Sequence, residues 1–240
     1  MTPLSCPNIP GSGAEPRPAL PRFYPIFDSA DWVARALAAG ARMVQLRIKD
    51  PGGPGGATLR AEITRARDLA RAHGAALVVN DHWRLAIELG CDWLHLGQED
   101  LDDADLAAIR VAGLRLGVST HDEAELDRAL AVGPDYVALG PVWPTILKQM
   151  KWAPQGLDRV ADWKRRVGTV PLVAIGGLTP ERGRAALEAG ADVVSAVTDI
   201  TLNPDPEGRM RAWLAATEAA GASRPRTPAG YLDKEDGAER

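Results

Sequence analysis

The sequence predicts a single (β/α)₈ barrel, an α/β fold in which eight parallel strands alternate with helices. Three observations favour this fold. Helical stretches repeatedly end in glycine, a short apolar run follows each of these glycines, and the chain holds eight apolar runs in all. Glycine just past a helix end adopts the left-handed backbone conformation at little cost. Short, almost continuously apolar runs between helices are typical of parallel strands that are covered by helices.

The first half of the chain contributes four strands. The run 23–27 precedes the first helix and is the first strand. Glycines at helix ends then precede each of the next three runs: Gly40 before 43–48, Gly74 before 76–79, and Gly90 before 93–96. The helix expected over Leu59–His73 places Leu59, Ile63, Ala66, Leu69 and Ala70 on one face, which is the pattern of an amphipathic helix packed on a sheet.

The second half repeats the arrangement. The expected strands and their preceding glycines are 114–118 after Gly113, 136–139 after Gly133, 172–175 after Gly168, and 193–197 after Gly190. The glycine spacing is widest after the second and the sixth strands, so long loops are expected there, at the catalytic mouth of a barrel. A doubly wound open sheet is the alternative fold that local patterning leaves open.

The composition is that of one globular domain. The chain has 240 residues, of which 45% are hydrophobic and 25% charged, and α/β barrels of about 200–250 residues commonly form one domain. We expect a flexible Pro- and Gly-rich segment at 1–21, the barrel at 22–220, and a flexible charged tail at 221–240. The two tails are therefore predicted to be disordered.

Charge and cysteine content narrow the function classes. The formal net charge is −4, which provides no overall basic field for nucleic acid or an anionic membrane surface. There is no apolar run of about 20 residues for a membrane span, and the N-terminus lacks a signal peptide's basic and apolar blocks. Two cysteines, Cys6 and Cys91, make no zinc set or disulfide framework. We expect a cytoplasmic protein, with the possibility of a homo-oligomer left open.

The end of the second strand carries a polar trio. Side chains alternate along a strand, so Gln45, Arg47 and Lys49 share one face and Leu46 and Ile48 the other. The apolar pair is expected to pack against helices. The two cations then point into the barrel mouth, which suits binding of a phosphate group. A solvated strand end is the alternative interpretation.

Acidic residues follow the third and fourth strands. Asp81 and Asp100 lie at adjacent strand ends, where two carboxylates can share a cation. Magnesium takes one or two protein carboxylates and completes its octahedron with water and substrate phosphates. The alternatives are a helix N-cap for Asp81 and a solvated loop position for Asp100.

Four other residues at the predicted strand ends and loops bear on the site. Ser119 is either a mouth residue or the cap of the next helix, and capping is favoured by position alone. His95 is interpreted as an interior histidine with satisfied hydrogen bonds. The long loop after the sixth strand carries Lys148, so it either closes over an anion or is a surface loop. Gly177, after the seventh strand, either leaves backbone N–H groups open to a phosphate or only relieves close packing.

Six segments together resemble the thiamine-phosphate synthase family, in the same order and at similar spacings, from about Phe23 to Trp213. They are Gln45–Asp50, Asn80–Asp81, His95–Asp100, Gly117–His121, Gly140–Thr145 and Ala174–Leu178. The resemblance implies a transferase that joins an aminopyrimidine methyl diphosphate to a thiazole phosphate, giving thiamine phosphate and pyrophosphate. It implies a dissociative reaction in which pyrophosphate leaves, a pyrimidine-methyl cation forms, and the thiazole nitrogen captures it.

The resemblance also implies a role for each site residue. Asp81 and Asp100 would hold Mg²⁺, and Arg47, Lys49 and Lys148 would be the catalytic cations. The pyrimidine diphosphate would be bound by Gln45, Leu46, Arg47, Ile48, Lys49, Asn80, Ser119 and Lys148. The thiazole phosphate would be bound by Thr145, Ile146, Leu147, Gly177, Val197 and Thr198. The implied partners are therefore small phosphorylated substrates.

The sequence departs from the family pattern at two positions. Leu147 stands where the family usually has Thr, which removes one expected hydroxyl contact to the thiazole phosphate. Thr198 stands where the family usually has Ser; the alternative alignment, through Ser195, breaks the register of the flanking residues. Two other functions are considered: a thiazole tautomerase, which would not need the carboxylates and cations, and a non-catalytic phosphate-sensing barrel. The sequence leaves open whether the thiazole substrate is carboxylated.

Overall fold

A computed structural model describes residues 19–49, 57–145 and 152–222 of the chain. Most of the two predicted tails, and the loop residues Ile146, Leu147 and Lys148, lie outside these ranges. Within them the eight predicted strands are all present and all parallel. They are β1 Ile26–Phe27, β2 Met43–Leu46, β3 Ala76–Asn80, β4 Trp93–Leu96, β5 Arg115–Thr120, β6 Tyr136–Leu139, β7 Leu172–Ile175 and β8 Val193–Ser195.

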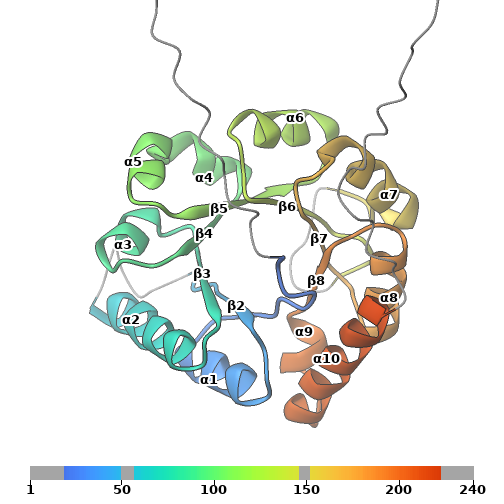
Figure 1. The fold of residues 1–240 in the computed structure, drawn as a ribbon, viewed down its shortest axis with the longest axis horizontal. Coiled ribbons are helices and arrows are strands. Elements are labelled where there is room, and N and C mark those ends of the chain that lie inside the picture. Colours follow the sequence, from blue (N-terminus) through green and yellow to red (C-terminus); the bar gives the residue numbers. More distant parts are fainter. Residues whose placement is uncertain (1–18, 50–56, 146–151, 223–240) are drawn as a thin grey trace, which may run out of the picture.

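The strands pair in sequence order from β1 to β8, and the segment that leads into β1 lies beside the last strand, β8 (Figure 1). Phe23 forms a parallel bridge with Val194, and the Tyr24 amide donates to the Val194 carbonyl over 3.0 Å. The Ile26 amide donates to the Ala196 carbonyl over the same distance. These contacts close the sheet, so the barrel is confirmed and the open doubly wound sheet is excluded.

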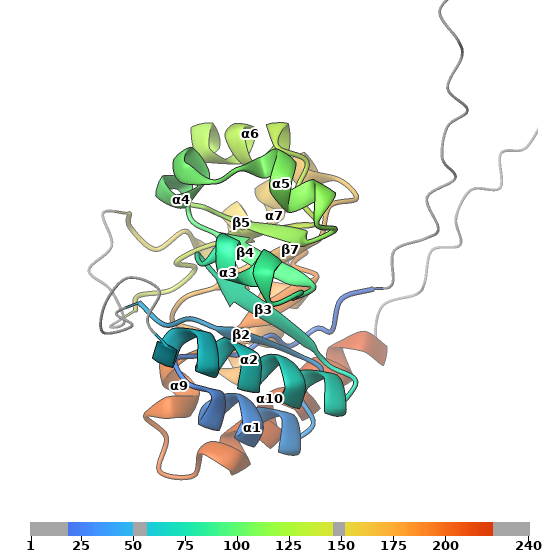
Figure 2. The same cartoon turned by 90° about the vertical axis from the view of Figure 1, so that its left-hand side faces the viewer.

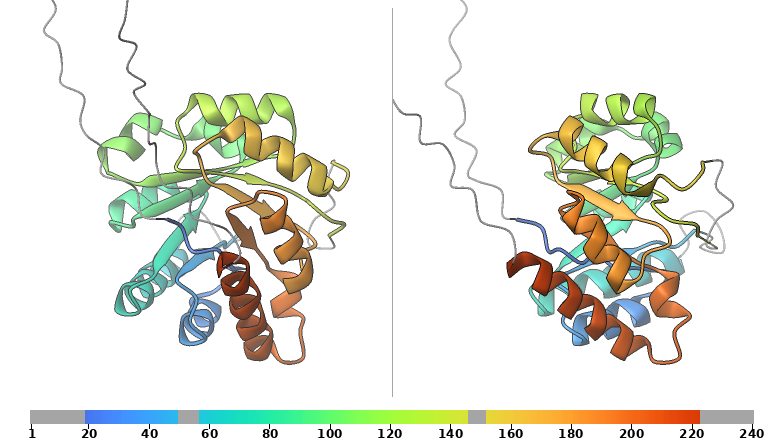
Figure 3. Two further views of the ribbon diagram at one scale, coloured as in Figure 1. Left: turned by 45° about the vertical axis from the view of Figure 1, so that its right-hand side comes forward. Right: turned by 90° about the vertical axis from the view of Figure 1, so that its right-hand side faces the viewer.

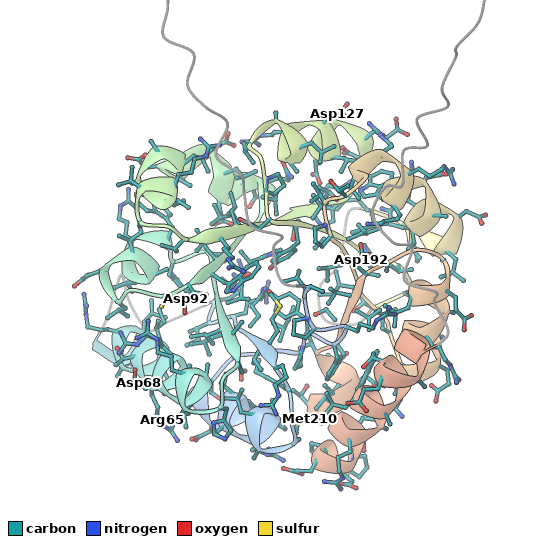
Figure 4. The ribbon with its side chains drawn as sticks, in the orientation of Figure 1. Arg65, Asp68, Asp92, Asp127, Asp192 and Met210 are labelled. Carbon is teal, nitrogen blue, oxygen red and sulfur yellow. The ribbon has the colours of Figure 1, made fainter. Side chains whose placement is uncertain are left out.

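Helices cover the outside of the barrel (Figures 1 and 2). They are α1 Ala30–Ala38, α2 Ala57–Ala72, α3 Trp83–Glu88, α4 Gln98–Asp103, α5 Leu106–Val111, α6 Glu123–Ala131, α7 Gly156–Val167, α8 Pro180–Glu188, α9 Thr198–Thr201 and α10 Pro206–Ala222. Helix α10 packs between α8 and α1 and so completes the outer layer (Figure 3). The acidic side chains of Asp68 on α2 and Asp127 on α6 lie on the outside of this layer (Figure 4).

Side-chain alternation separates two apolar regions. In β6, Tyr136 and Ala138 belong to the cluster inside the barrel, whereas Val137 and Leu139 pack in the larger core between strands and helices. A strand presents successive side chains to opposite faces, and β2, β3, β4, β6, β7 and β8 each contribute to both regions. In β2, Leu46 packs in the outer core and Ile48, just beyond the strand, packs against it, as expected.

Several strand boundaries differ from those predicted. β2 ends at Leu46 rather than at residue 48, and β8 ends at Ser195 rather than 197, whereas β5 begins one residue later and extends to Thr120. The last residues of the expected β2 and β8 runs leave the ladder because the backbone there enters a loop and the short helix α9. Helix α2 begins at Ala57, two residues before the predicted start.

Candidate active site

The carboxyl ends of β2, β3 and β4 bring the predicted cations and carboxylates together. The Lys49 ammonium forms an ion pair with the Asp81 carboxylate. Asp81 follows β3 with a left-handed backbone, φ 64°, and its amide donates to the His95 carbonyl of β4 over 2.9 Å. The N-cap position of α3 is His82, so the interpretation of Asp81 as a helix cap is wrong.

Asp100 lies in the first turn of α4, directly beside Asp81. Its carboxylate accepts a hydrogen bond from the Gly97 amide over 3.2 Å. Partial burial raises the pKa of Asp100, and the neighbouring Asp81 carboxylate raises it further, whereas Lys49 opposes the rise. Two carboxyl groups that face each other in this way favour binding of a cation. The described residues hold no cluster of three or more His, Cys, Asp or Glu that could bind a metal, and Mg²⁺ needs only one or two carboxylates. The residues present therefore fit a magnesium ion.

The Arg47 guanidinium also belongs to this group of charges. Burial lowers the pKa of His95 to about 4, and the positive charge of Arg47 is the next cause, with a smaller effect from Lys49. Arg47 leaves β2 with its amide donating to the Phe27 carbonyl over 2.7 Å. The polar trio of β2 is thus divided: Gln45 is buried inside the barrel, and Arg47 and Lys49 follow the strand end.

Asn80 and Ser119 complete the pyrimidine side of the predicted site. Asn80 is buried at the end of β3, and its side-chain nitrogen finds no hydrogen-bond partner among the described residues. A buried donor without a partner is costly unless a ligand accepts from it. The Ser119 hydroxyl is 2.8 Å from His95 Nε2. The cap of α6 is Asp122, which accepts from the Glu125 amide, so the capping interpretation of Ser119 is wrong.

The loop after β6 packs on the end of β7. The Val142 and Trp143 amides donate to the Ile175 and Gly176 carbonyls over 2.9 and 3.0 Å. A β-carbon at Gly177, where φ is 65°, would lie 2.3 Å from the Pro144 carbonyl oxygen. The missing side chain therefore makes room for the loop backbone, which is the packing role that the sequence left open for Gly177. Thr145 is the last residue described before the gap at 146–151.

The end of β8 leads into α9. Val197 precedes the helix and Thr198 is its first residue. The Asp199 carboxylate accepts from Arg209 Nε and Nη2, each over 2.8 Å, and from Trp213 Nε1 over 2.8 Å, which ties α9 to α10. Ser195 is buried, and its hydroxyl donates to the Tyr24 carbonyl over 2.6 Å. That internal bond supports the choice of Thr198 over Ser195 as the mouth residue.

A family model described as thiamine monophosphate synthase matches residues 23–200 of the chain. The chain belongs to this family. The predicted resemblance is therefore confirmed, and with it an enzyme with the activity of a thiamine-phosphate synthase. The thiamine-phosphate synthase of Rhizobium etli is 65% identical over 195 residues, which cover 81% of this chain and 94% of that protein. The one from Neisseria meningitidis serogroup B is 48% identical over 194 residues, covering 81% and 93%.

A solved structure of a thiamine-phosphate synthase family member has the same fold. The thiamine phosphate pyrophosphorylase from Pyrococcus furiosus superimposes with a TM-score of 0.72 at 27% identity, covering 83% of this chain and 96% of that one. No described helix is both long enough and apolar enough to cross a membrane.

Sequence reasoning missed two tyrosines that touch the predicted site from inside the barrel. Tyr24 and Tyr136 are buried, their hydroxyls are 2.8 Å apart, and Tyr136 is 2.9 Å from His95 Nδ1. Period-two alternation in β6 places Tyr136 on the inner face. The facing Gly117 of β5 was the available signal, because a glycine opposite a tyrosine leaves space for the ring.

Proposed function

We propose that this chain condenses an aminopyrimidine methyl diphosphate with a thiazole phosphate and releases pyrophosphate. The observation that carries the proposal is the group formed by Lys49, Asp81 and Asp100 at three adjacent strand ends, next to Arg47. Mixed cations and carboxylates at one point suit a diphosphate bound together with a divalent metal. A phosphate monoester alone would not need the carboxylates.

Each residue of the pyrimidine side has a distinct task. Asp81 and Asp100 would hold Mg²⁺, which when bound would neutralise charge on the diphosphate. Arg47 and Lys49 would bind the diphosphate oxygens and stabilise the negative charge that grows on them as the C–O bond breaks. Asn80 would donate its unpaired side-chain hydrogens to the same substrate, together with Ser119. Gln45 would lie behind the pyrimidine, whereas Leu46 and Ile48, whose side chains pack in or against the outer core, would contact the substrate only through their backbone groups.

The thiazole side would hold the nucleophile in line with the breaking bond. Gly177 and the turn Val197–Thr198 offer backbone N–H groups at the ends of β7 and β8, where barrels commonly bind phosphate. Thr145, with Ile146, Leu147 and Lys148 beyond it, would cover the two substrates. A dissociative reaction needs mainly positioning and charge stabilisation, so no side-chain nucleophile takes part. The site would serve small phosphorylated substrates in the cytoplasm.

The metal assignment is tested by removing each carboxylate. Asp81→Ala and Asp100→Ala are expected to lower kcat/KM by at least ~10²-fold, because each removes a major electrostatic contribution. Asp103→Ala, an exposed aspartate of the same helix as Asp100, is the control and is expected to match the parent protein. The measurement is pyrophosphate release with both substrates and Mg²⁺. Full turnover after chelator treatment would exclude the magnesium assignment.

The same assay separates the alternatives. A thiazole tautomerase would isomerise the thiazole precursor without releasing pyrophosphate, and a phosphate sensor would turn over neither substrate. Retention of Arg47, Lys49, Asp81 and Asp100 in one group supports the synthase reaction over both.

A further inference from the structure

A chain of hydrogen bonds crosses the interior of the barrel and ends at Ser119. Gln45 Nε2 donates to the Tyr24 hydroxyl over 2.5 Å, and the Tyr24 and Tyr136 hydroxyls are 2.8 Å apart. Tyr136 is 2.9 Å from His95 Nδ1, and His95 Nε2 is 2.8 Å from Ser119 Oγ. All but Ser119 are buried below the mouth.

Which atom donates in each of these hydrogen bonds follows from Gln45, the first residue of the series. An amide nitrogen can only donate, so the Tyr24 oxygen accepts from Gln45 and its own hydrogen points to Tyr136. Tyr136 therefore donates to His95 Nδ1. Any other direction would leave the buried Tyr24 hydrogen without an acceptor, which is costly.

The tautomer of His95 decides which atom donates in the hydrogen bond between His95 and Ser119. Because Nδ1 accepts from Tyr136, it carries no hydrogen, and the His95 ring in this arrangement is neutral. A neutral ring that accepts at Nδ1 carries its hydrogen on Nε2. His95 then donates to Ser119 Oγ, which leaves the serine hydrogen without an acceptor among the described residues.

Gly117 of β5 leaves the space that the Tyr136 ring needs in order to take part in this series of hydrogen bonds. A β-carbon at Gly117 would lie 2.0 Å from Cζ of Tyr136. Only glycine lets the tyrosine ring lie across β5, where its hydroxyl reaches His95. The Tyr24 ring meets the Tyr136 ring edge-on, at 81°, with centroids 5.8 Å apart. Packing thus fixes both hydroxyls.

We propose that Tyr136 and His95 are positioning residues that hold Ser119 as a hydrogen-bond donor facing the substrate. The inference rests on the proposed function, in which Ser119 contacts the diphosphate of the pyrimidine substrate. Diphosphate oxygens only accept hydrogen bonds. A serine that directs its hydrogen to His95 would present lone pairs to them and repel them, whereas a serine that accepts from His95 presents its hydrogen before the substrate binds.

Tyrosine-to-phenylalanine substitutions test the chain in the full-length enzyme. Tyr136→Phe removes the donor to His95 and is expected to lower kcat/KM by about tenfold, the scale of one hydrogen bond to a charged group. Tyr24→Phe is the matched control: it removes an equally buried hydroxyl but leaves Tyr136 able to donate to His95. It is expected to change kcat/KM by less than about threefold. Equal losses in the two variants would overturn the proposal.

A double-mutant cycle separates positioning from folding. In a Ser119→Ala background, Tyr136→Phe is expected to cause no further loss, because the residue through which it acts is already absent. An undiminished tenfold loss there would mean that Tyr136 acts by another route and would refute the proposal. Thermal melting of all four proteins shows whether a variant fails to fold.

Nitrogen NMR of histidine-labelled protein shows which ring nitrogen of His95 carries the hydrogen, and it does so without an activity assay. His95 is expected to carry its hydrogen on Nε2 in the parent protein and in Tyr24→Phe, and to lose that preference in Tyr136→Phe. A His95 with its hydrogen on Nδ1 in the parent protein would reverse the chain and overturn the proposal. Failure of the synthase reaction would instead show as no pyrophosphate release by the parent protein, whatever the tautomer.

Discussion

At the scale of single residues, Gly177 combines a left-handed backbone with close packing. Gly177→Ala is expected to destabilise the protein and weaken thiazole phosphate binding, because the β-carbon would press on the Pro144 carbonyl oxygen and move the loop. Gly133→Ala is the matched control, since Gly133 has φ 66° and open space around it. Gly133→Ala is expected to lower the free energy of unfolding only by the backbone strain of an alanine at positive φ, about 1 kcal/mol. Calorimetric titration with each substrate tests this, and equal weakening of the pyrimidine diphosphate would contradict the assignment.

Leu147 is the one predicted contact residue that lacks the family's hydroxyl. If backbone groups near Gly177 and Thr198 supply most of the phosphate contacts, Leu147→Thr is expected to change thiazole phosphate affinity by no more than ~1 kcal/mol, the net value of one hydrogen bond. The dissociation constant of the thiazole phosphate, measured for the parent protein and for Leu147→Thr, tests this prediction. A much larger gain would assign phosphate recognition to the loop.

Residue types and strand ends were enough to predict that Lys49, Asp81 and Asp100 meet at the mouth, but not which bonds the site residues make. Asp81 and Ser119 both stand where helix caps are common, and position alone favoured capping for the serine. Their partners, Lys49 and His95, come from other strands. A local pattern cannot show such contacts, because they depend on how the strands are staggered around the barrel.

At the scale of elements, α9 is held in place by one carboxylate. Asp199 binds Arg209 and Trp213 of α10 and is largely buried. Asp199→Ala is expected to destabilise the protein by about 1.5–3 kcal/mol, the scale of hydrogen bonds to a charged group, and to raise KM for the thiazole phosphate through Thr198. Glu188→Ala, an exposed carboxylate on α8, is the control. Denaturant unfolding measures the change in stability, and steady-state kinetics measure the change in KM. An unchanged KM would mean that α9 does not take part in binding the thiazole phosphate.

Glycines located the elements well because a helix end requires a particular backbone conformation. Gly40, Gly74, Gly90, Gly113 and Gly133 all have positive φ at the predicted helix ends. Strand ends were predicted less accurately: apolar character continues past Leu46 and Ser195, although the ladder stops there. Ile48 packs against the outer core and Ala196 lies in it, although both residues are outside the strands, and hydropathy does not distinguish the two situations.

At the scale of the whole molecule, closure depends on contacts between the two ends of the barrel. The bridge between Phe23 and Val194 joins residues far apart in sequence, and the rings of Phe23 and Trp213 stack with centroids 5.0 Å apart. The count of eight apolar runs predicted closure, since eight strands suffice to form a barrel filled by side chains. The pairing of Tyr24 with Tyr136 is a product of closure, so the alternation that places Tyr136 inside the barrel could not predict its partner.

From these closing contacts we predict the limits of the smallest stable unit. They lie between Phe23 and Trp213, and α10 ends at Ala222. A protein spanning residues 20–222 is therefore expected to melt cooperatively and to turn over like the full chain, because the removed segments are rich in proline, glycine and charge and have little apolar surface to bury.

A protein spanning residues 30–222 is the informative control. It lacks β1 and the residues that bridge to Val194 and stack on Trp213. Removing them opens the barrel between β2 and β8 and exposes Tyr136 from inside, since Tyr24 goes with them. This shorter protein is expected to lose its cooperative transition. Calorimetric melting and pyrophosphate release compare the three proteins. If the 20–222 protein also lost its transition, residues outside the barrel would be part of the folded unit, and the predicted domain limits would be wrong.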